Sequence, residues 1–218
     1  MKFYFDGCSF TAGGGLKKNG YDPSEYRWSK LVCDHFGAEE YNWANSGVSN
    51  DQILRHLFTG QVYEEDRSQV KDIRFDLNDF DFFFIQTTFP SRFEYFDEMK
   101  QRWSALKSNS SARKLKTNDN LREWLDYYYK EIYSDRQCDV KEIVTVKSIE
   151  SQLKSLNKPY VITTIIRKPV MTYDIEINKR GDDGKFLKYD RLPCQHPSPS
   201  GHRQLADDII KKVENEYN

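Results

Sequence analysis

Residues 80–85, Phe-Asp-Phe-Phe-Phe-Ile, decide the fold of this 218-residue chain. A nearly continuous apolar run of this length is typical of a strand that is buried on both faces of a parallel sheet. Residues 2–5 and 160–166 have a similar character, and 40–43 and 173–177 are weaker candidates for strands. The sequence therefore predicts a central sheet of mostly parallel strands.

Amphipathic helices alternate with these strands. Apolar residues recur at helical spacing over 28–36, 53–58, 140–156 and 205–213. Residues 121–133 also have apolar side chains along one helical face, and we assign this face to packing in the core. Buried strands that alternate with such helices favour a three-layer α/β/α fold. In this fold the reactive site lies at the carboxyl ends of the strands. We expect one domain over residues 1–218, with a helical or loop insertion at about 90–137.

The composition argues against several classes of partner. The 33 basic and 34 acidic residues leave a net charge of -1, so neither a nucleic-acid nor a membrane partner is expected. No apolar run has the length of a membrane span, and Asp6 interrupts any signal-peptide core. Four scattered cysteines fit reduced thiols. We therefore expect a cytoplasmic protein, and its oligomeric state stays open.

Ser9 and His196 are the first candidates for chemistry. Ser9 directly follows the first predicted strand, but its hydroxyl is a poor nucleophile until an imidazole takes its proton. A serine after a strand also commonly caps a turn, so the segment alone leaves both roles open. His196 precedes the terminal helix at the same edge of the sheet. It is the best available base, because the other histidines fall within predicted helices (His35, His56 and His202).

Four short motifs resemble, in order, the blocks of the SGNH/GDSL hydrolases. Residues 7–11 (Gly-Cys-Ser-Phe-Thr) resemble the first block, and residues 45–50 (Asn-Ser-Gly-Val-Ser-Asn) the second. Residues 86–88 (Gln-Thr-Thr) stand where the third block falls, and residues 196–202 resemble the last, with its His-Pro step. Cys in the first block, joined to Phe-Thr-Ala-Gly, is similar to a divergent subgroup from bacteriophage and marine bacterial genomes. The resemblance implies a flavodoxin-like SGNH hydrolase fold.

The resemblance also implies a serine esterase that transfers an acyl group to water without a cofactor. Ser9 would attack the ester carbonyl, and His196 would take and return the proton. The backbone N–H groups of Ser9 and Gly47 would hold the oxyanion. The implied substrate is a small-molecule or carbohydrate ester, for example an O-acetyl group on a carbohydrate.

Two positions depart from the family pattern. The asparagine of the third block is missing, and Thr88 aligns best with it, while Asn50 is an alternative amide donor to the oxyanion. The acid expected three residues before the histidine is replaced by Pro193. Asp190 is the nearest upstream carboxylate and would complete a Ser-His-Asp triad. A Ser–His dyad without an acid is an equal alternative.

Other interpretations stay open. Arg92 can bind a carboxylate or phosphate of a substrate, or it can pair with Glu94. A binding domain that has lost catalysis keeps the same motifs. A nucleotide- or phosphate-binding protein would use the Gly-rich loop at 13–15 with Arg92, although the Gly-Lys-Ser/Thr ending of a phosphate loop is absent. No metal site is expected, because Cys194 and His196 have no second Cys/His pair at suitable spacing.

Overall fold

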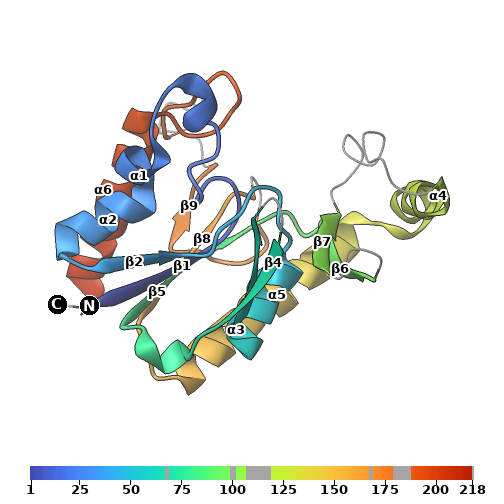
Figure 1. Cartoon of the computed structure of the whole chain (residues 1–218), viewed down its shortest axis with the longest axis horizontal. Helices are drawn as coiled ribbons and strands as arrows, with labels where there is room; N and C mark the ends of the chain where they lie inside the picture. The colour runs from blue at the N-terminus through green and yellow to red at the C-terminus, as the bar shows by residue number, and fades with distance from the viewer. Residues whose placement is uncertain (67–68, 99–101, 107–118, 167–168, 179–187, 218) are drawn as a thin grey trace.

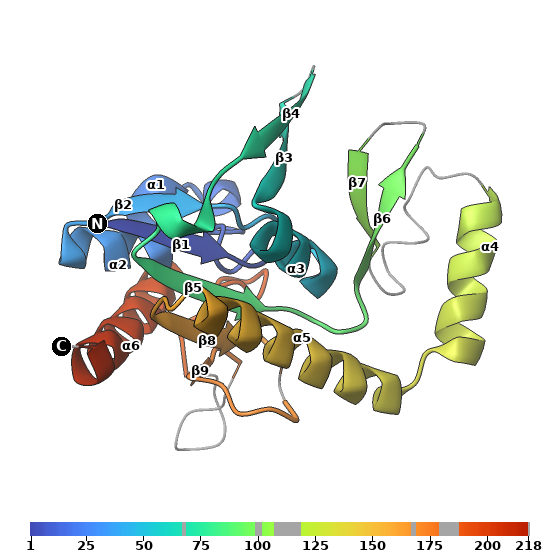
Figure 2. The same cartoon turned by 90° about the horizontal axis from the view of Figure 1, so that it is seen from below.

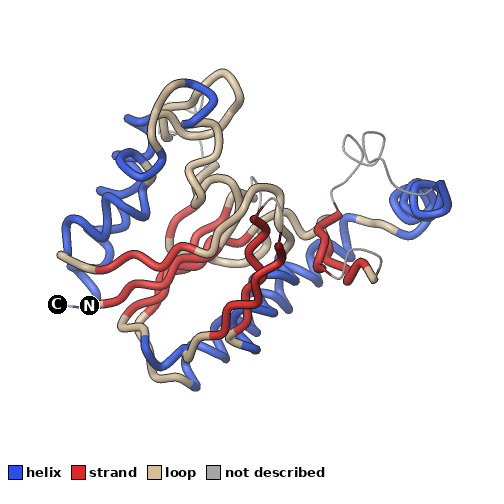
Figure 3. Tube along the Cα trace, viewed as in Figure 1, coloured by secondary structure: helices blue, strands red, loops and turns tan. Residues whose placement is uncertain are grey.

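A five-stranded sheet forms the centre of the computed structural model, which describes residues 1–66, 69–98, 102–106, 119–166, 169–178 and 188–217 (Figure 1). Each neighbouring pair of strands is parallel, so the chain returns between strands through helices or long loops. All five strands therefore end at one edge, where loops follow them (Figure 3). The order is β2 (Glu39–Asn42), β1 (Lys2–Asp6), β5 (Phe82–Thr87), β8 (Tyr160–Thr164) and β9 (Ile175–Glu176).

The central strands β1 and β5 bury aromatic side chains on both faces, because successive side chains of a strand point in opposite directions. Phe5 and Phe84 stack with ring centroids 4.7 Å apart in the cluster on one face. Tyr4 and Phe83 lie 5.1 Å apart in the cluster on the other face. Burial of each such ring contributes about 1.5–3 kcal/mol to folding. The prediction of a doubly buried central strand is confirmed.

Helices cover both faces of this sheet (Figure 1). On one side, α2 (Trp28–Phe36) packs with α6 (Pro199–Tyr217), and on the other α3 (Asn50–Thr59) packs with α5 (Asp135–Ser155). The predicted three-layer α/β/α fold is therefore confirmed. Shorter helical segments complete the described chain: η1 (Lys17–Asn19), α1 (Pro23–Tyr26), η2 (Leu77–Asp79), α4 (Asp119–Tyr127) and the π-helical η4 (Tyr128–Ile132).

Two antiparallel hairpins were not expected from the sequence. One joins β3 (Gln61–Asp66) to β4 (Gln69–Arg74), and the other joins β6 (Phe93–Asp97) to β7 (Arg102–Leu106). Many of their residues are charged, so the alternation of apolar and polar residues that marks a half-buried strand is weak. The region expected to be an insertion, at about 90–137, holds β6, β7, α4 and η4, while 99–101 and 107–118 lie outside the described residues.

Arg55 of α3 joins the two hairpins to the body of the molecule, where they stand close to that helix (Figure 2). Its Nε and Nη2 each donate a 2.9 Å hydrogen bond to the carboxylate of Glu94 on β6. Its Nη1 donates to the carbonyl of Gln61 on β3, and its guanidinium lies 5.0 Å from the ring centroid of Trp103 on β7. Because α3 begins at Asn50, the last residue of the 45–50 segment, this pairing connects both hairpins to that segment.

Helix caps fix the loops at the carboxyl edge of the sheet. The hydroxyl of Ser49 accepts a hydrogen bond from the backbone N–H of Gln52 and so caps the start of α3. Pro199 is the first residue of α6, and the Ser198 hydroxyl accepts from the N–H of Gly201. Helix α3 thus starts at the last residue of the second sequence block, and α6 starts within the last block.

Candidate active site

The turn that carries Ser9 leaves β1 and is held by β5. The N–H groups of Thr11 and Ala12 both donate to the carbonyl of Cys8, at 3.0 and 3.1 Å. The Thr11 hydroxyl donates to the side-chain oxygen of Gln86 at 2.6 Å, and the Gln86 amide donates to the Cys8 sulfur at 3.2 Å. Gln86 is fully buried, so it anchors the turn from inside the protein. Ser9 itself is left partly exposed.

His196 reaches Ser9 from the opposite end of the chain. The 191–197 segment folds back on itself, because Arg191 and Pro197 form an antiparallel bridge and the N–H of Leu192 donates to the His196 carbonyl at 2.8 Å. This turn places Nε2 of His196 2.9 Å from Oγ of Ser9. A pair at this separation can transfer a proton from the hydroxyl to the ring.

The Gly-rich loop packs against this pair. A Cβ atom at Gly14 would lie 2.7 Å from Cβ of Ser9, and one at Gly15 would lie 3.1 Å from Cβ of His196. The N–H of Gly14 also donates to the Ser9 carbonyl at 2.5 Å. Because glycine has no side chain, the loop can approach both residues closely. This close approach explains the run of glycines without invoking phosphate binding.

Burial lowers the pKa of His196 below its usual 6.5, because a partly buried site disfavours the charged imidazolium. The Cys194 carbonyl lies near the ring and acts in the opposite direction, while the positive charges of Arg191 and Lys18 lower the pKa further. Within the described residues, Nδ1 of His196 is buried and makes no hydrogen bond of good geometry. The lowered pKa favours the neutral ring, the state in which it can accept a proton.

Asp190 is not brought to His196. Its carboxylate accepts a 2.8 Å hydrogen bond from the Ser200 hydroxyl and a longer one, 3.5 Å, from the Gln204 amide. Asp190 is exposed, and its backbone faces the start of α6, where the N–H of Ser198 donates to its carbonyl. The geometry gives no support to a triad through Asp190, because the side chain is used to hold the first turn of α6.

The turn that carries Ser9 and the neighbouring 45–50 loop each have a backbone N–H group without an acceptor among the described residues. The 45–50 loop runs next to the serine turn, since the N–H of Asn45 donates to the Gly7 carbonyl at 3.1 Å. Gly47 adopts a positive φ of 81°, which favours glycine. In the described parts of the chain, the N–H groups of Ser9 and Gly47 have no hydrogen-bond acceptor. Such donors can bind an oxyanion.

The three predicted side-chain ligands of the substrate make hydrogen bonds within the protein. Asn50 is 4% exposed, and its amide is occupied on both sides, accepting from the N–H of Thr88 at 2.8 Å and donating to the Thr88 carbonyl at 3.0 Å. Thr88 is 0% exposed, and its hydroxyl accepts from Nη1 of Arg92 at 2.8 Å. The same Nη1 donates to the carbonyl of Val48 at 3.2 Å. These three predicted ligands of the substrate therefore bind one another and the backbone.

A buried polar cluster behind the serine turn was missed by the sequence analysis. Nδ1 of His56 lies 2.8 Å from Oδ2 of Asp6, and the Tyr4 hydroxyl donates to the same oxygen. The other carboxylate oxygen accepts from the N–H of Gly7 at 2.7 Å. Two signals were available: an acid that ends an apolar strand, and a histidine three residues after Ile53 on the inner stripe of a helix. The cluster ties α3 to the turn that holds the serine.

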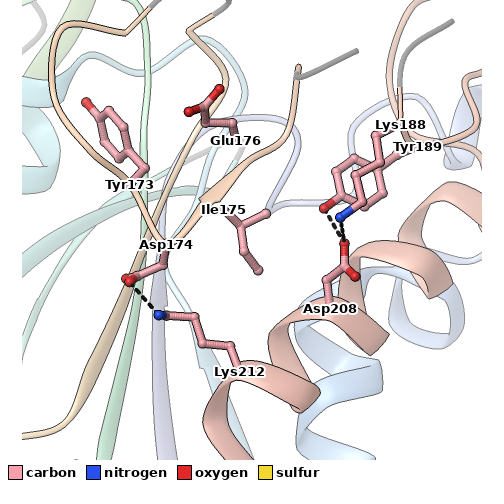
Figure 4. A pocket seen from close by; sticks show the side chains of 8 residues that line it. All are labelled: Tyr173, Asp174, Ile175, Glu176, Lys188, Tyr189, Asp208 and Lys212. Carbon is pink, nitrogen blue, oxygen red and sulfur yellow. Dashed lines mark hydrogen bonds and ion pairs between the residues drawn. The ribbon is translucent and has the colours of Figure 1, made fainter. Parts of the chain in front are cut away.

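A cavity of about 270 Å³ lies beside β9 and α6, and Ser9 and His196 are not among its lining residues (Figure 4). Its wall carries the ion pairs of Lys212 with Asp174 and of Lys188 with Asp208. Neither Ser9 nor any other residue of the serine turn lines it. The basic side chains of its wall are therefore each paired with a carboxylate.

The described residues also hold no group of three or more His, Cys, Asp or Glu side chains placed to bind a metal ion. Among the same residues, every helix is too short or too polar to cross a lipid bilayer. The four cysteines are free thiols.

Comparisons with known proteins bear on the fold. No protein-family model matches the chain, and no curated protein matches its sequence. Its structure is similar to that of a carbohydrate esterase, with a TM-score of 0.52 and 12% identity over 100% of this chain and 65% of the other. It is also similar to an acetyl xylan esterase from the rumen bacterium Butyrivibrio proteoclasticus, with a TM-score of 0.51 and 11% identity over 99% of this chain and 64% of the other.

These likenesses show that the chain has the fold of those two esterases. The chain spans slightly less than two thirds of the length of either protein. The three-layer fold expected from the alternation of strands and helices is the one observed.

Proposed function

We propose that this protein is a serine hydrolase that cleaves esters by a Ser–His dyad. The observation that carries the proposal is the 2.9 Å contact between Oγ of Ser9 and Nε2 of His196, made across almost the whole length of the chain. The two unused N–H groups of Ser9 and Gly47, and the fold shared with two carbohydrate esterases, add support. Contacts of this kind define a nucleophile and its base on many unrelated folds.

The proposed reaction has two halves. His196 accepts the Ser9 proton at Nε2 as Oγ attacks the ester carbonyl carbon, and the N–H groups of Ser9 and Gly47 stabilise the resulting oxyanion. The imidazolium then returns the proton to the leaving alcohol, and an acyl-serine forms. Water repeats the sequence on the acyl-serine and releases the carboxylic acid.

Among the described residues no carboxylate bonds to Nδ1 of His196, so the proposed dyad works without one. For Nε2 to accept a proton, Nδ1 must carry the ring hydrogen, and in triads an acid holds that tautomer. Here the nearby Cys194 carbonyl is the candidate acceptor. A neutral carbonyl stabilises the imidazolium less than a carboxylate does, so we expect a modest turnover.

The proposed substrate is an O-acyl group on a small molecule or carbohydrate, with an acetyl ester on a sugar as the first to test. This follows from the acetyl xylan esterase and the carbohydrate esterase that share the fold. The four free thiols suit a reducing compartment, so we propose a cytoplasmic location. Cell fractionation that finds the protein outside the cytoplasm would overturn that location.

A fluorophosphonate probe and p-nitrophenyl acetate test the proposal together. We expect the probe to label wild-type protein at Ser9, and turnover to disappear in Ser9→Ala and in His196→Gln. Labelling and hydrolysis that survive Ser9→Ala would place the reaction elsewhere. A folded wild-type protein that neither reacts with the probe nor cleaves esters, yet binds saccharides, would instead be a binding domain on this fold. Thermal stabilisation by nucleotides would favour the phosphate-binding alternative.

A further inference from the structure

Arg92 connects the loop that carries Gly47 to the end of β5. Its Nη1 donates to the Val48 carbonyl at 3.2 Å and to the Thr88 hydroxyl at 2.8 Å. Its guanidinium carbon lies 4.9 Å from the ring centroid of Phe89, which supports it from one side. One nitrogen of the side chain thus holds two segments that are 40 residues apart in sequence.

The loop needs such a restraint, because its own backbone provides few. It is tied at its start by Asn45 to the Gly7 carbonyl, and at its end by the Asn50 amide, which grips both sides of the Thr88 peptide backbone. Between these points, in the described structure, the N–H groups of residues 47–49 donate to no acceptor. Arg92 contacts this middle stretch at the Val48 carbonyl, one residue after Gly47.

We propose that Arg92 is a positioning residue that aims the Gly47 N–H at the oxyanion. It anchors on the Thr88 hydroxyl and holds the Val48 carbonyl, which stops the flexible glycine from turning its N–H away. Arg92, Thr88 and Asn50 thereby do indirectly what the missing third-block asparagine would do by contact. This inference rests on the proposed hydrolase function.

The expected size of the effect follows from the geometry required of an oxyanion donor. Loss of one such donor lowers kcat by about 10²–10³-fold, and a displacement of about 1 Å has a similar effect. Arg92→Ala should therefore lower kcat for p-nitrophenyl acetate by about 10- to 100-fold, since the N–H is misdirected for part of the time rather than removed. KM should change little, because a residue that only positions the Gly47 loop makes no contact with the substrate.

The experiment combines three variants with chemical rescue. Added guanidinium chloride at low, non-denaturing concentration should restore part of kcat to Arg92→Ala. Thr88→Val removes the anchor, so Arg92→Ala in that background should cost much less than it does alone. Arg27, which pairs with Glu40, provides the matched control: Arg27→Ala should leave kcat within about twofold and should not respond to guanidinium.

The outcomes separate the alternatives. A raised KM with unchanged kcat would mean that Arg92 binds the substrate directly, and unchanged kinetics would mean that it has no role; either result overturns the inference. If Arg92→Ala does not fold, Arg92→Lys decides, because an ammonium cannot reproduce the guanidinium geometry and should still lower kcat. A wild-type protein that does not react with a fluorophosphonate rejects the hydrolase itself, and is thus distinguishable from failure of the Arg92 proposal.

Discussion

Gly14→Ala is the sharpest single test of the candidate site. The added methyl group would lie 2.7 Å from both Cβ and the carbonyl oxygen of Ser9, and 3.2 Å from Cδ2 of His196. Carbon atoms pack at about 3.5–4.0 Å, so the serine turn or the Gly-rich loop must move by about 1 Å. The Ser9 carbonyl cannot move independently, because it accepts the Gly14 N–H at 2.5 Å.

A displacement of about 1 Å at the nucleophile costs about 100-fold in rate, which is about 2.7 kcal/mol of transition-state stabilisation. We therefore expect kcat for p-nitrophenyl acetate, and the rate of fluorophosphonate labelling, to fall together by that factor. Overpacking should also lower the free energy of unfolding by about 1–3 kcal/mol, to be measured by urea denaturation.

Gly20→Ala is the matched control. Gly20 adopts a φ of 83°, but no atom lies within 4 Å of a Cβ placed there. Its substitution strains the backbone at a cost of about 1–3 kcal/mol without crowding the serine. Its kcat should stay near the wild-type value. Gly14→Ala protein that is folded and turns over within threefold of wild type would refute the idea that this loop sets the geometry of Ser9 and His196.

Three further predictions concern pH and stability. Because burial holds the pKa of His196 below 6.5, kcat/KM should stay high down to pH 6.5 and fall only at lower pH; a limb at or above 6.5 would contradict this. Burial also lowers the pKa of His202 to about 3, so its contribution to stability should be complete above pH 6.5 and be lost as the pH falls toward 3. His202→Gln should flatten that dependence in urea unfolding, whereas the same change at exposed His35 should not. Arg55→Met should lower the free energy of unfolding by about 3–5 kcal/mol, because the carboxylate of Glu94, whose side chain is 3% exposed, loses its cation. Adding Glu94→Gln should recover most of this loss. If it recovers none, the unpaired carboxylate is not the cause.

The main elements could be predicted because their signals are local. The apolar run at 80–85 and the helical spacing over 28–36 each reflect one strand or helix that must bury one or two faces, and both are observed. The β3–β4 and β6–β7 hairpins were missed because their strands are rich in charged residues and pair through backbone hydrogen bonds, which leave little mark on composition.

The roles of individual polar side chains were harder to predict. Asp190, Asn50, Thr88 and Arg92 all lie at the expected edge of the sheet, yet they bond to neighbouring backbone and side chains. Each polar group takes whichever partner lies within about 3 Å, and the loops on which these residues stand decide that partner. Spacing in sequence does not contain this information.

The sequence by itself determined the alternation of strands and helices, and with it a parallel sheet whose carboxyl edge collects the loops after β1, β2 and β5. Only the tertiary structure decided that Ser9 and His196 meet at 2.9 Å and that Asp190 turns away to Ser200. The physical reason is range: periodicity acts between residues a few positions apart, whereas a hydrogen bond between residues 9 and 196 requires the whole fold to be in place.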